Sequence, residues 1–192
     1  MITKNEILKI IKPETPLERR ICEDPDFIDG VKYGKERKGH PEGQIIYHIG
    51  EVLQNIQKYH KDHKLREKLR LITLIHDSFK HQVDPKFPRL GDNHHSRIAY
   101  QFAKKYITDQ DMLLVIKYHD DAYNIWKKGS KTNDWEKSYH LIHRLLTKIN
   151  VDLYFMFYRC DNETGDKTQK DLIWFEEIIT EKSKLNFDGD VI

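Results

Sequence analysis

The sequence predicts an all-α fold around one hydrophobic core. Three observations favour this class: apolar residues recur at helical spacing in most segments, the one strand-like run has no partner strands, and proline and glycine gather in a few connecting segments. The chain has 192 residues, of which 33% are charged, and it contains 8 Phe, 10 Tyr and 3 Trp. This composition suits charged helix faces around a sizeable core and argues against a disordered chain.

The first 40 residues are predicted to form an N-terminal appendage. Short helices are expected at 5–11 and 17–22, the first of them stopped by a proline. Residues 23–43 are rich in Asp, Gly, Pro and Lys, which predicts a loop. The functional domain is then expected to cover 41–192.

Four helices with apolar stripes are predicted to follow. Pro41 is expected to open the first, because proline is tolerated in the first turn of a helix. The segment 81–93, with its prolines, separates the second helix from the third, and the fourth begins near Asp109. The stripes are, in chain order, Ile45, Ile49, Val52, Leu53 and Ile56; Leu65, Leu69 and Ile72; Ala99, Phe102, Ala103 and Tyr106; Met112, Val115 and Ile116.

The C-terminal part of the chain is predicted to contain three more helices. A loop with Gly129 and Ser130 is expected before a helix at 134–148. The apolar run 149–158 has a composition that also suits a strand, but we predict a helix because no partner strand is found. A last helix is expected at 169–182.

Five of these helices direct a polar residue toward the expected core. Where an apolar stripe is continued by a helical step, the next residue is a histidine or an aspartate; these are His48, His76, His95, His119 and Asp161. One such histidine is usually a hydrogen-bonded core residue. Five on separate helices favour a shared partner, because burying these groups unpaired is costly. A metal ion would satisfy them together, since neutral imidazole and ionised carboxylate are suitable ligands.

The order and context of these residues resemble the HD-domain metal-dependent phosphohydrolases, a family named for an adjacent His-Asp pair at a helix end. The first histidine of the family's metal core corresponds to His48 in YHIGEVL, the pair to His76 and Asp77 in LIHDSFK, and the distant aspartate to Asp161 in YRCDNETGDK. The resemblance covers about residues 40–165. It implies an HD-type helical domain whose metal core is formed by these four residues.

The resemblance also implies roles for residues between the pair and the last aspartate. Many members carry further histidines there, which hold a second metal or meet the substrate, and the candidates are His95 in NHHSRIAY and His119 in YHDDAYN. His94 is the alternative to His95, and Asp120 either assists or caps a helix. Lys80 follows the pair by one turn and matches a lysine that helps to hold phosphate in this family.

The reaction implied by the resemblance is attack of a metal-activated water on phosphorus. With two ions, Asp77 is the expected bridging carboxylate; with one, His95 and His119 would bind phosphate or move protons. Mixed nitrogen and oxygen ligands without cysteine favour one or two divalent ions of Mn, Fe, Co, Ni or Zn, with Mg as a further option. The predicted catalytic residues are Asp77, Lys80, His95 and His119.

The predicted substrate is a phosphorylated small molecule or a nucleotide, with RNA or DNA ends included. The string FYRCDNETGDK followed by WFEE is similar to stand-alone HD proteins and HD modules of polynucleotide end repair. The acidic pair of nucleotide-alarmone hydrolases and the Gly-Tyr-Pro signature of cyclic-dinucleotide phosphodiesterases are both missing. Lys80, Lys38 and Arg97 are the predicted substrate-binding residues, although Lys38 also fits a solvated loop.

Composition excludes several other classes. The net charge of +2 is too small to indicate a nucleic-acid-binding module by itself, and two cysteines indicate neither a disulfide framework nor a zinc knuckle. No glycine-rich phosphate loop or nucleophile elbow is present. Without a long apolar run, the chain is expected to be cytoplasmic and free of membrane. Two alternatives stay open: a di-iron oxygenase of the same fold, and a non-catalytic sensor that binds nucleotide or metal.

Overall fold

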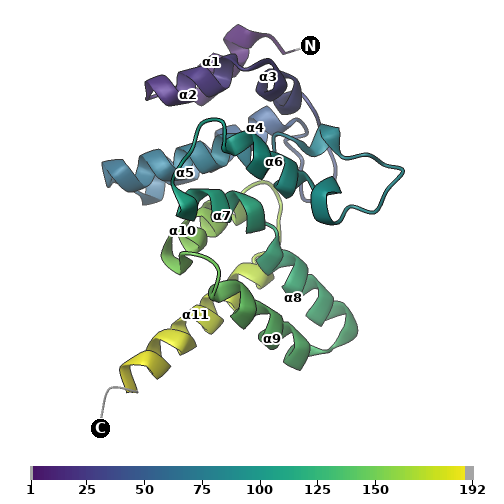
Figure 1. Cartoon of the computed structure of the whole chain (residues 1–192), viewed down its shortest axis with the longest axis vertical. Helices are drawn as coiled ribbons and strands as arrows, with labels where there is room; N and C mark the ends of the chain where they lie inside the picture. The colour runs from purple at the N-terminus through teal and green to yellow at the C-terminus, as the bar shows by residue number, and fades with distance from the viewer. Residues whose placement is uncertain (1, 189–192) are drawn as a thin grey trace.

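The helices of the computed structural model are stacked from the N-terminal group at one end to α11 at the other (Figure 1). The structure describes residues 2–188, with side chains described as far as residue 181, and no strand occurs in that part of the chain. The helices are α1 (Lys4–Ile11), α2 (Pro16–Glu23), α3 (Pro25–Val31), α4 (Ile45–Tyr59), α5 (His63–Ile75), α6 (His95–Ala103), α7 (Gln110–Tyr118), α8 (Asp121–Thr132), α9 (Trp135–Leu146), α10 (Val151–Asn162) and α11 (Lys170–Asp188), with short 3₁₀ turns η1 (Lys80–Gln82) and η2 (Gly91–Asn93).

Polar caps determine where several helices begin. Thr3 and Glu6 form a reciprocal capping box at α1, and Thr15 caps α2, whose first residue is a proline. The side chain of Asp109 accepts hydrogen bonds from two backbone amides of α7, and Asn150 caps α10. These caps set the first residues of α7 and α10, and both helices belong to the core.

The N-terminal helices cover one side of α4 and α5 (Figure 1). Their buried residues Ile7, Ile21 and Phe27 belong to the same hydrophobic cluster as α4 and α5. The prediction that all of 23–43 is loop is wrong, because Asp24 caps α3 and a proline occupies its first turn. A seven-residue helix is too short to show a periodic apolar pattern.

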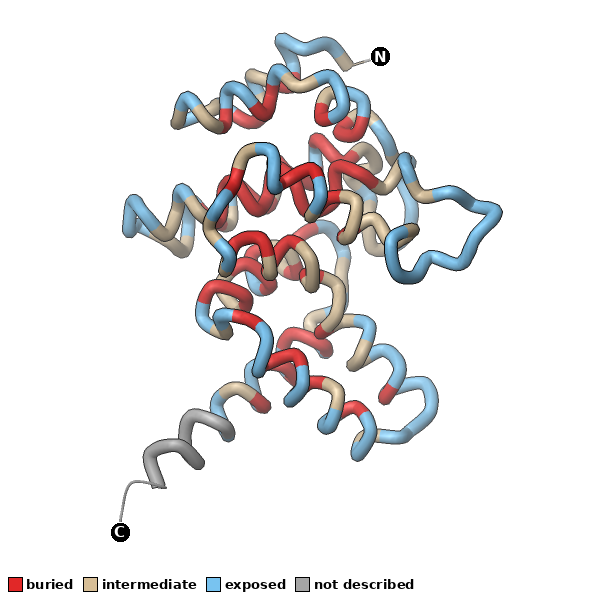
Figure 2. Tube along the Cα trace, in the orientation of Figure 1, coloured by how far each residue is buried: buried red, intermediate tan, exposed pale blue. Residues whose placement is uncertain are grey.

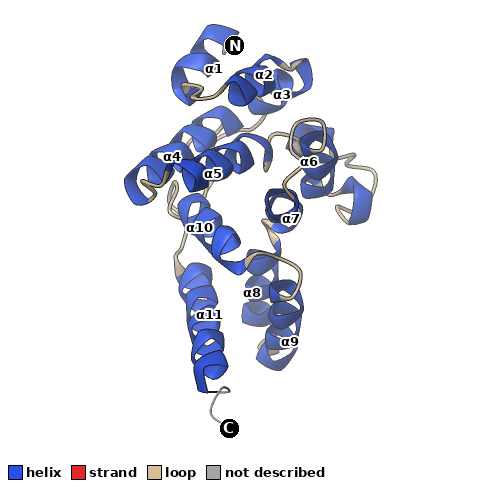
Figure 3. Cartoon of the chain, turned by 60° about the vertical axis from the view of Figure 1, so that its left-hand side comes forward, coloured by secondary structure: helices blue, strands red, loops and turns tan. Residues whose placement is uncertain are grey.

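The core runs through the middle of the stack, where α4, α5, α7 and α10 contact one another (Figures 2 and 3). Figure 2 shows buried segments concentrated on the inward faces of these helices. The segment 151–162 is helical, which confirms the choice of helix over strand. Helices α8, α9 and α11 extend the stack at the C-terminal end, and α8 contacts both α9 and α11.

Two predicted boundaries are wrong. Gly129 and Ser130 lie inside α8 and not in a loop. Gly129 is needed for close packing, since a Cβ there would lie 2.5 Å from Ser138 Oγ and 3.0 Å from the Trp135 ring. Pro41 does not open a helix; α4 begins at Ile45, after a turn that contains Gly43 at φ +76°.

Within residues 2–188, no helix is both long and apolar enough to cross a bilayer.

Candidate metal centre

Five helices deliver imidazole or carboxylate groups to one point in the core. His48 lies in the first turn of α4, His76 follows α5, His95 begins α6, His119 follows α7, and Asp161 lies near the end of α10. The side chains of His48, His76 and His119 are almost fully buried. Each of these residues thus lies on the inward side of its helix, as predicted. Asp77, the residue after His76, joins the same centre.

Three of the groups form a first triad: His48, His76 and Asp161. The Nε2 atom of His48 lies 2.8 Å from Asp161 Oδ1, and the Nε2 atom of His76 lies 3.6 Å from the same oxygen. Because these atoms come from α4, α5 and α10, the triad joins three helices at one point.

A second triad consists of Asp77, His95 and His119. The Nε2 atoms of both histidines lie 3.3 Å from Asp77 Oδ1 and 3.2 Å from each other. The other oxygen of Asp77, Oδ2, faces the first triad, at 3.6 Å from His76 Nε2 and 4.0 Å from His48 Nε2. Asp77 therefore presents one carboxylate oxygen to each triad.

Backbone carbonyls fix the orientation of two of the rings. His76 Nδ1 lies 2.9 Å from the Thr73 carbonyl oxygen, and His119 Nδ1 lies 2.8 Å from the Ile116 carbonyl oxygen. A carbonyl only accepts, so each Nδ1 carries the hydrogen and donates it. When these rings are neutral, Nε2 holds a lone pair directed at the centre, which is the form that binds a metal.

Several buried polar atoms at the centre have no hydrogen-bond partner among the described residues. They are His48 Nε2, His76 Nε2, Asp77 Oδ1 and Asp161 Oδ1. The close approach of His48 Nε2 to Asp161 does not have the direction of a hydrogen bond. Leaving such groups unpaired in a protein interior is costly, and each is of a type that binds divalent metals. The buried histidines and aspartates could therefore hold a metal ion.

The carboxylates of the centre are ionised. Burial alone would raise the pKa of Asp77, but Lys80 and His76 bring it well below its usual value. Burial likewise opposes the low pKa of Asp161, which the charge of Lys167 and the nearby His48 ring maintain. Burial lowers the pKa of His48, so its ring is neutral near pH 7. His48 and Asp161 thus have the protonation states that a metal requires.

Two groups beside the triads were not placed in the metal set from the sequence. Glu42, whose side chain is only 4% exposed, has Oε1 2.9 Å from His40 Nδ1 and 3.5 Å from His48 Nδ1. Asp120 Oδ2 lies 3.0 Å from His95 Nε2 and 3.9 Å from His94 Nε2. Glu42 and His40 lie in the loop before α4, where no helical period marks them. Their only signal in the sequence was their nearness to His48 along the chain.

The predicted substrate-binding residues lie in different surroundings. Lys80 forms an ion pair with Asp77 Oδ2 and lies within the centre. Lys38 lines a cavity beside the centre, on the loop that precedes α4. Arg97 lies away from the cavity walls, with its guanidinium 5.1 Å above the ring of Tyr118. The structure thus brings Lys80 and Lys38 to the site but not Arg97.

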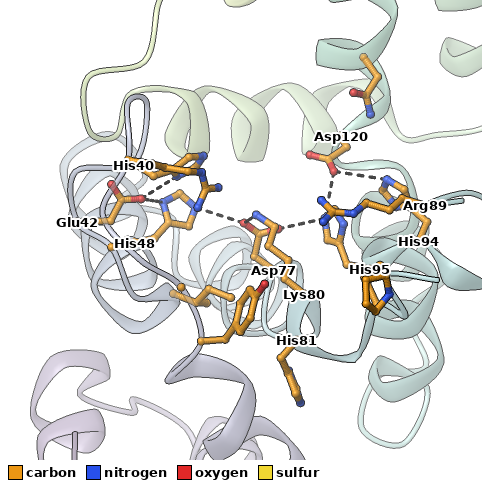
Figure 4. Close-up of a pocket in the computed structure, with 18 residues that line it drawn as sticks. His40, Glu42, His48, Asp77, Lys80, His81, Arg89, His94, His95 and Asp120 are labelled. Carbon is orange, nitrogen blue, oxygen red and sulfur yellow. Dashed lines mark hydrogen bonds and ion pairs between the residues drawn. The ribbon is translucent and has the colours of Figure 1, made fainter. Parts of the chain in front are cut away.

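Two cavities meet at Asp77 and form the two arms of a cleft. Its first arm, of about 680 Å³, is lined by His95, Tyr33 and Arg89, and its second arm, also of about 680 Å³, is lined by Asp161 and Lys127. The residues common to the walls of both arms are Arg37, His40, Asp77, Lys80 and Asp120. Figure 4 shows Asp77 and Lys80 between the group of His40, Glu42 and His48 and the group of Arg89, His94, His95 and Asp120.

The fold and this centre define an all-helical protein with paired histidine–aspartate triads suited to metal ions. Comparison with protein-family models, with curated proteins and with solved structures gives no match for this chain.

Proposed function

We propose that this protein is a metal-dependent phosphohydrolase of the HD-domain type that acts on a nucleotide or a nucleic-acid phosphate. The observation that carries the proposal is the position of Asp77, with one oxygen toward the first triad and the other toward the second. A carboxylate shared between two sets of ligands is the arrangement used to hold a pair of divalent ions. Paired ions suit displacement at phosphorus, because they stabilise both the attacking and the leaving oxygen.

The donor set narrows the choice of metal. Each triad combines two imidazole nitrogens with a carboxylate oxygen, and neither contains a sulfur ligand. Such ligands suit Mn, Fe, Co, Ni or Zn, whereas Mg and Ca prefer oxygen throughout. When bound, such an ion lowers the pKa of a coordinated water toward about 7 and neutralises charge on phosphoryl oxygens.

The chain's own residues would bind and orient the phosphate. Burial alone would lower the pKa of Lys80, but the carboxylates of Asp77 and Asp120 raise it, so the side chain stays cationic. Its side chain is 26% exposed and lines both arms of the cleft. Arg37 lines both arms of the cleft beside Lys80. These two cations can pair with the non-bridging oxygens of a phosphate located at Asp77.

The direct test measures hydrolysis by metal-stripped protein reloaded with Mn, Co, Ni, Zn or Mg. The panel contains bis(p-nitrophenyl) phosphate, nucleoside mono- and triphosphates, 2′,3′-cyclic nucleotides and 3′-phosphorylated RNA. We expect metal-dependent turnover that falls by about 10³-fold or more in Asp77→Ala. The control Asp152→Ala changes an exposed aspartate of α10 and should leave turnover unchanged. Stoichiometric metal binding without turnover of any ester would reject the hydrolase and favour a sensor or an oxygenase.

A further inference from the structure

The two arms of the cleft indicate more about the substrate than the metal centre does. We infer, building on the proposed hydrolase function, that the substrate is a single-stranded oligonucleotide whose internal phosphodiester lies at Asp77 and Lys80, with nucleotides on both sides of it in the two arms. The inference adds a substrate class and a direction of binding to the proposed reaction.

The two arms meet at the reaction centre. Each has a volume of about 680 Å³, and both have Asp77 and Lys80 in their walls. One arm alone falls within the roughly 300–1,000 Å³ that is usual for a small-molecule site. A phosphomonoester has an organic group on one side of its phosphate only, so it would occupy one arm. A diester has organic groups on both sides and accounts for both arms.

Cationic side chains also line the walls of each arm outside the shared centre. Arg89 lines the first arm, and Lys38 and Lys127 line the second. Arg89 and Lys127 are exposed, and none of the three belongs to a triad. Cations beyond a central phosphate fit a ligand with further phosphates along its length. A polynucleotide strand supplies such further phosphates, whereas an isolated diester does not.

The walls also offer surfaces for unpaired bases. Tyr33, which is 49% exposed, lines the first arm, and Tyr123 lines the second with the Lys127 ammonium 5.2 Å from its ring centroid. Phe87, on the same loop as Arg89, is 63% exposed. Aromatic rings interleaved with cations are the usual platform for single-stranded nucleic acid, since every base can stack on a ring. Base-paired strands would not expose their base faces in this way.

The loop that carries Arg89 has a defined shape. The Asn93 side-chain amide donates hydrogen bonds to the carbonyl oxygens of Asp84, Phe87 and Pro88, and its oxygen accepts one from the Asp84 amide. These bonds tie the two ends of the loop together, so Arg89 and Phe87 are presented on an ordered segment at the edge of the first arm.

The inferred reaction is hydrolysis of one phosphodiester. A water oxygen forms a bond to phosphorus, the bond from phosphorus to the leaving nucleoside oxygen breaks, and that oxygen takes up a proton. The products are one strand that ends in a phosphomonoester and one that ends in a hydroxyl. No oxidant, reductant or second substrate is required.

The test compares two esters on the Mn-loaded protein: a fluorescein-labelled hexanucleotide, as RNA and as DNA, and bis(p-nitrophenyl) phosphate. The variants are Arg89→Ala for the first arm and Lys127→Ala for the second. Lys86→Ala and Lys128→Ala are matched controls, because these exposed lysines neighbour the tested residues but lie outside the cleft walls. Product lengths and the salt dependence of KM are measured together with kcat.

We expect internal cleavage of at least one hexanucleotide. Each arm variant should raise KM for it by roughly tenfold, as for loss of one charge-assisted contact, and should lower the salt slope by about 0.7. Both should hydrolyse the small diester within about twofold of wild type, since it has no further phosphates for Arg89 or Lys127 to contact, and the controls should match wild type. Hydrolysis of the small diester with no cleavage of either hexanucleotide, or removal of terminal phosphate only, would overturn the inference and leave the hydrolase standing. Hydrolysis of neither ester would overturn both.

Discussion

Helix α5 and the residues just after it carry buried charged groups at two places. At one place the groups have partners within the protein, and at the other they do not. Within the helix, Arg70 donates to both carboxylate oxygens of Glu18, at 3.0 and 2.7 Å, and to the carbonyl oxygens of Ile11 and Lys12. Just beyond the end of the helix, Asp77 and His76 have buried atoms without a hydrogen-bond partner among the described residues. The first group is complete within the protein, and the second is not.

This difference separates a structural ion pair from a candidate binding centre. The Arg70 pair joins α5 to α2 and to the end of α1, and its donors and acceptors match. At the metal centre, histidine nitrogens and carboxylate oxygens point at one another across two triads. Four of these buried atoms have no hydrogen-bond partner among the described residues, and a metal cation could supply one. Buried charge by itself does not mark a binding site, whereas an incomplete set of partners favours one.

The largest expected effect is a loss of stability when the buried Arg70–Glu18 pair is broken. Arg70→Ala should destabilise the protein by about 3–5 kcal/mol, because Glu18 would be left buried without its partner. The free energy of unfolding in urea measures the loss, and Lys64→Ala, at an exposed position of the same helix, is the control. The folded variant should still bind metal as wild type does. A loss below about 1 kcal/mol, as for an exposed pair, would contradict the comparison.

The second expected effect is a pH dependence of metal affinity at the second triad. Burial alone would lower the pKa of His119, but the Asp120 and Asp77 carboxylates raise it to about 9. A metal needs the neutral ring, so below pH 9 an ion that enters the second triad must displace a proton. Metal affinity, measured by calorimetric titration, should therefore rise with pH by up to about tenfold per unit. An affinity that is constant between about pH 6.5 and 8.5 would be inconsistent with metal binding at His119.

The smallest effect concerns the buried carboxylate behind the first triad. Glu42→Gln keeps the shape of the side chain but removes the charge 3.5 Å from His48 Nδ1. We expect the affinity of the first triad for metal to fall by about tenfold, with the second triad unchanged. Glu36→Gln, on the same loop and exposed, is the control. Equal weakening of both sites would show that Glu42 acts on the fold of the loop and not on His48.

Helical periodicity predicted those parts of the centre that lie on or next to helices. Continuing the apolar stripes identified His76, His95 and His119, and the structure brings all three to one point. This works because a helix fixes the direction of every residue one turn beyond its stripe. The same reasoning could not assign a place to Glu42, His40 or Lys167, which lie in loops whose path depends on contacts distant in sequence, such as the bond from the Gly39 amide to Asp166.

The errors in the fold have a related cause. Glycine and proline predict loops at 23–43 and at 129–130, yet Pro25 occupies the first turn of α3 and Gly129 lies inside α8. Proline at the start of a helix and glycine at a close contact both satisfy helical geometry. Only the packing partner reveals the second case, and for Gly129 that partner is the pair of Trp135 and Ser138 from α9.

The measurement that tests the central claim most directly is the number of metal ions held per chain. Purified protein would be loaded with Mn or Zn, dialysed against metal-free buffer and analysed by plasma mass spectrometry, beside Asp77→Asn and the control Asp152→Asn. The account predicts two ions for wild type and for the control, and fewer than one for Asp77→Asn, because one oxygen of Asp77 serves each triad. Wild-type protein that retains no ion, or Asp77→Asn that retains both, would contradict it.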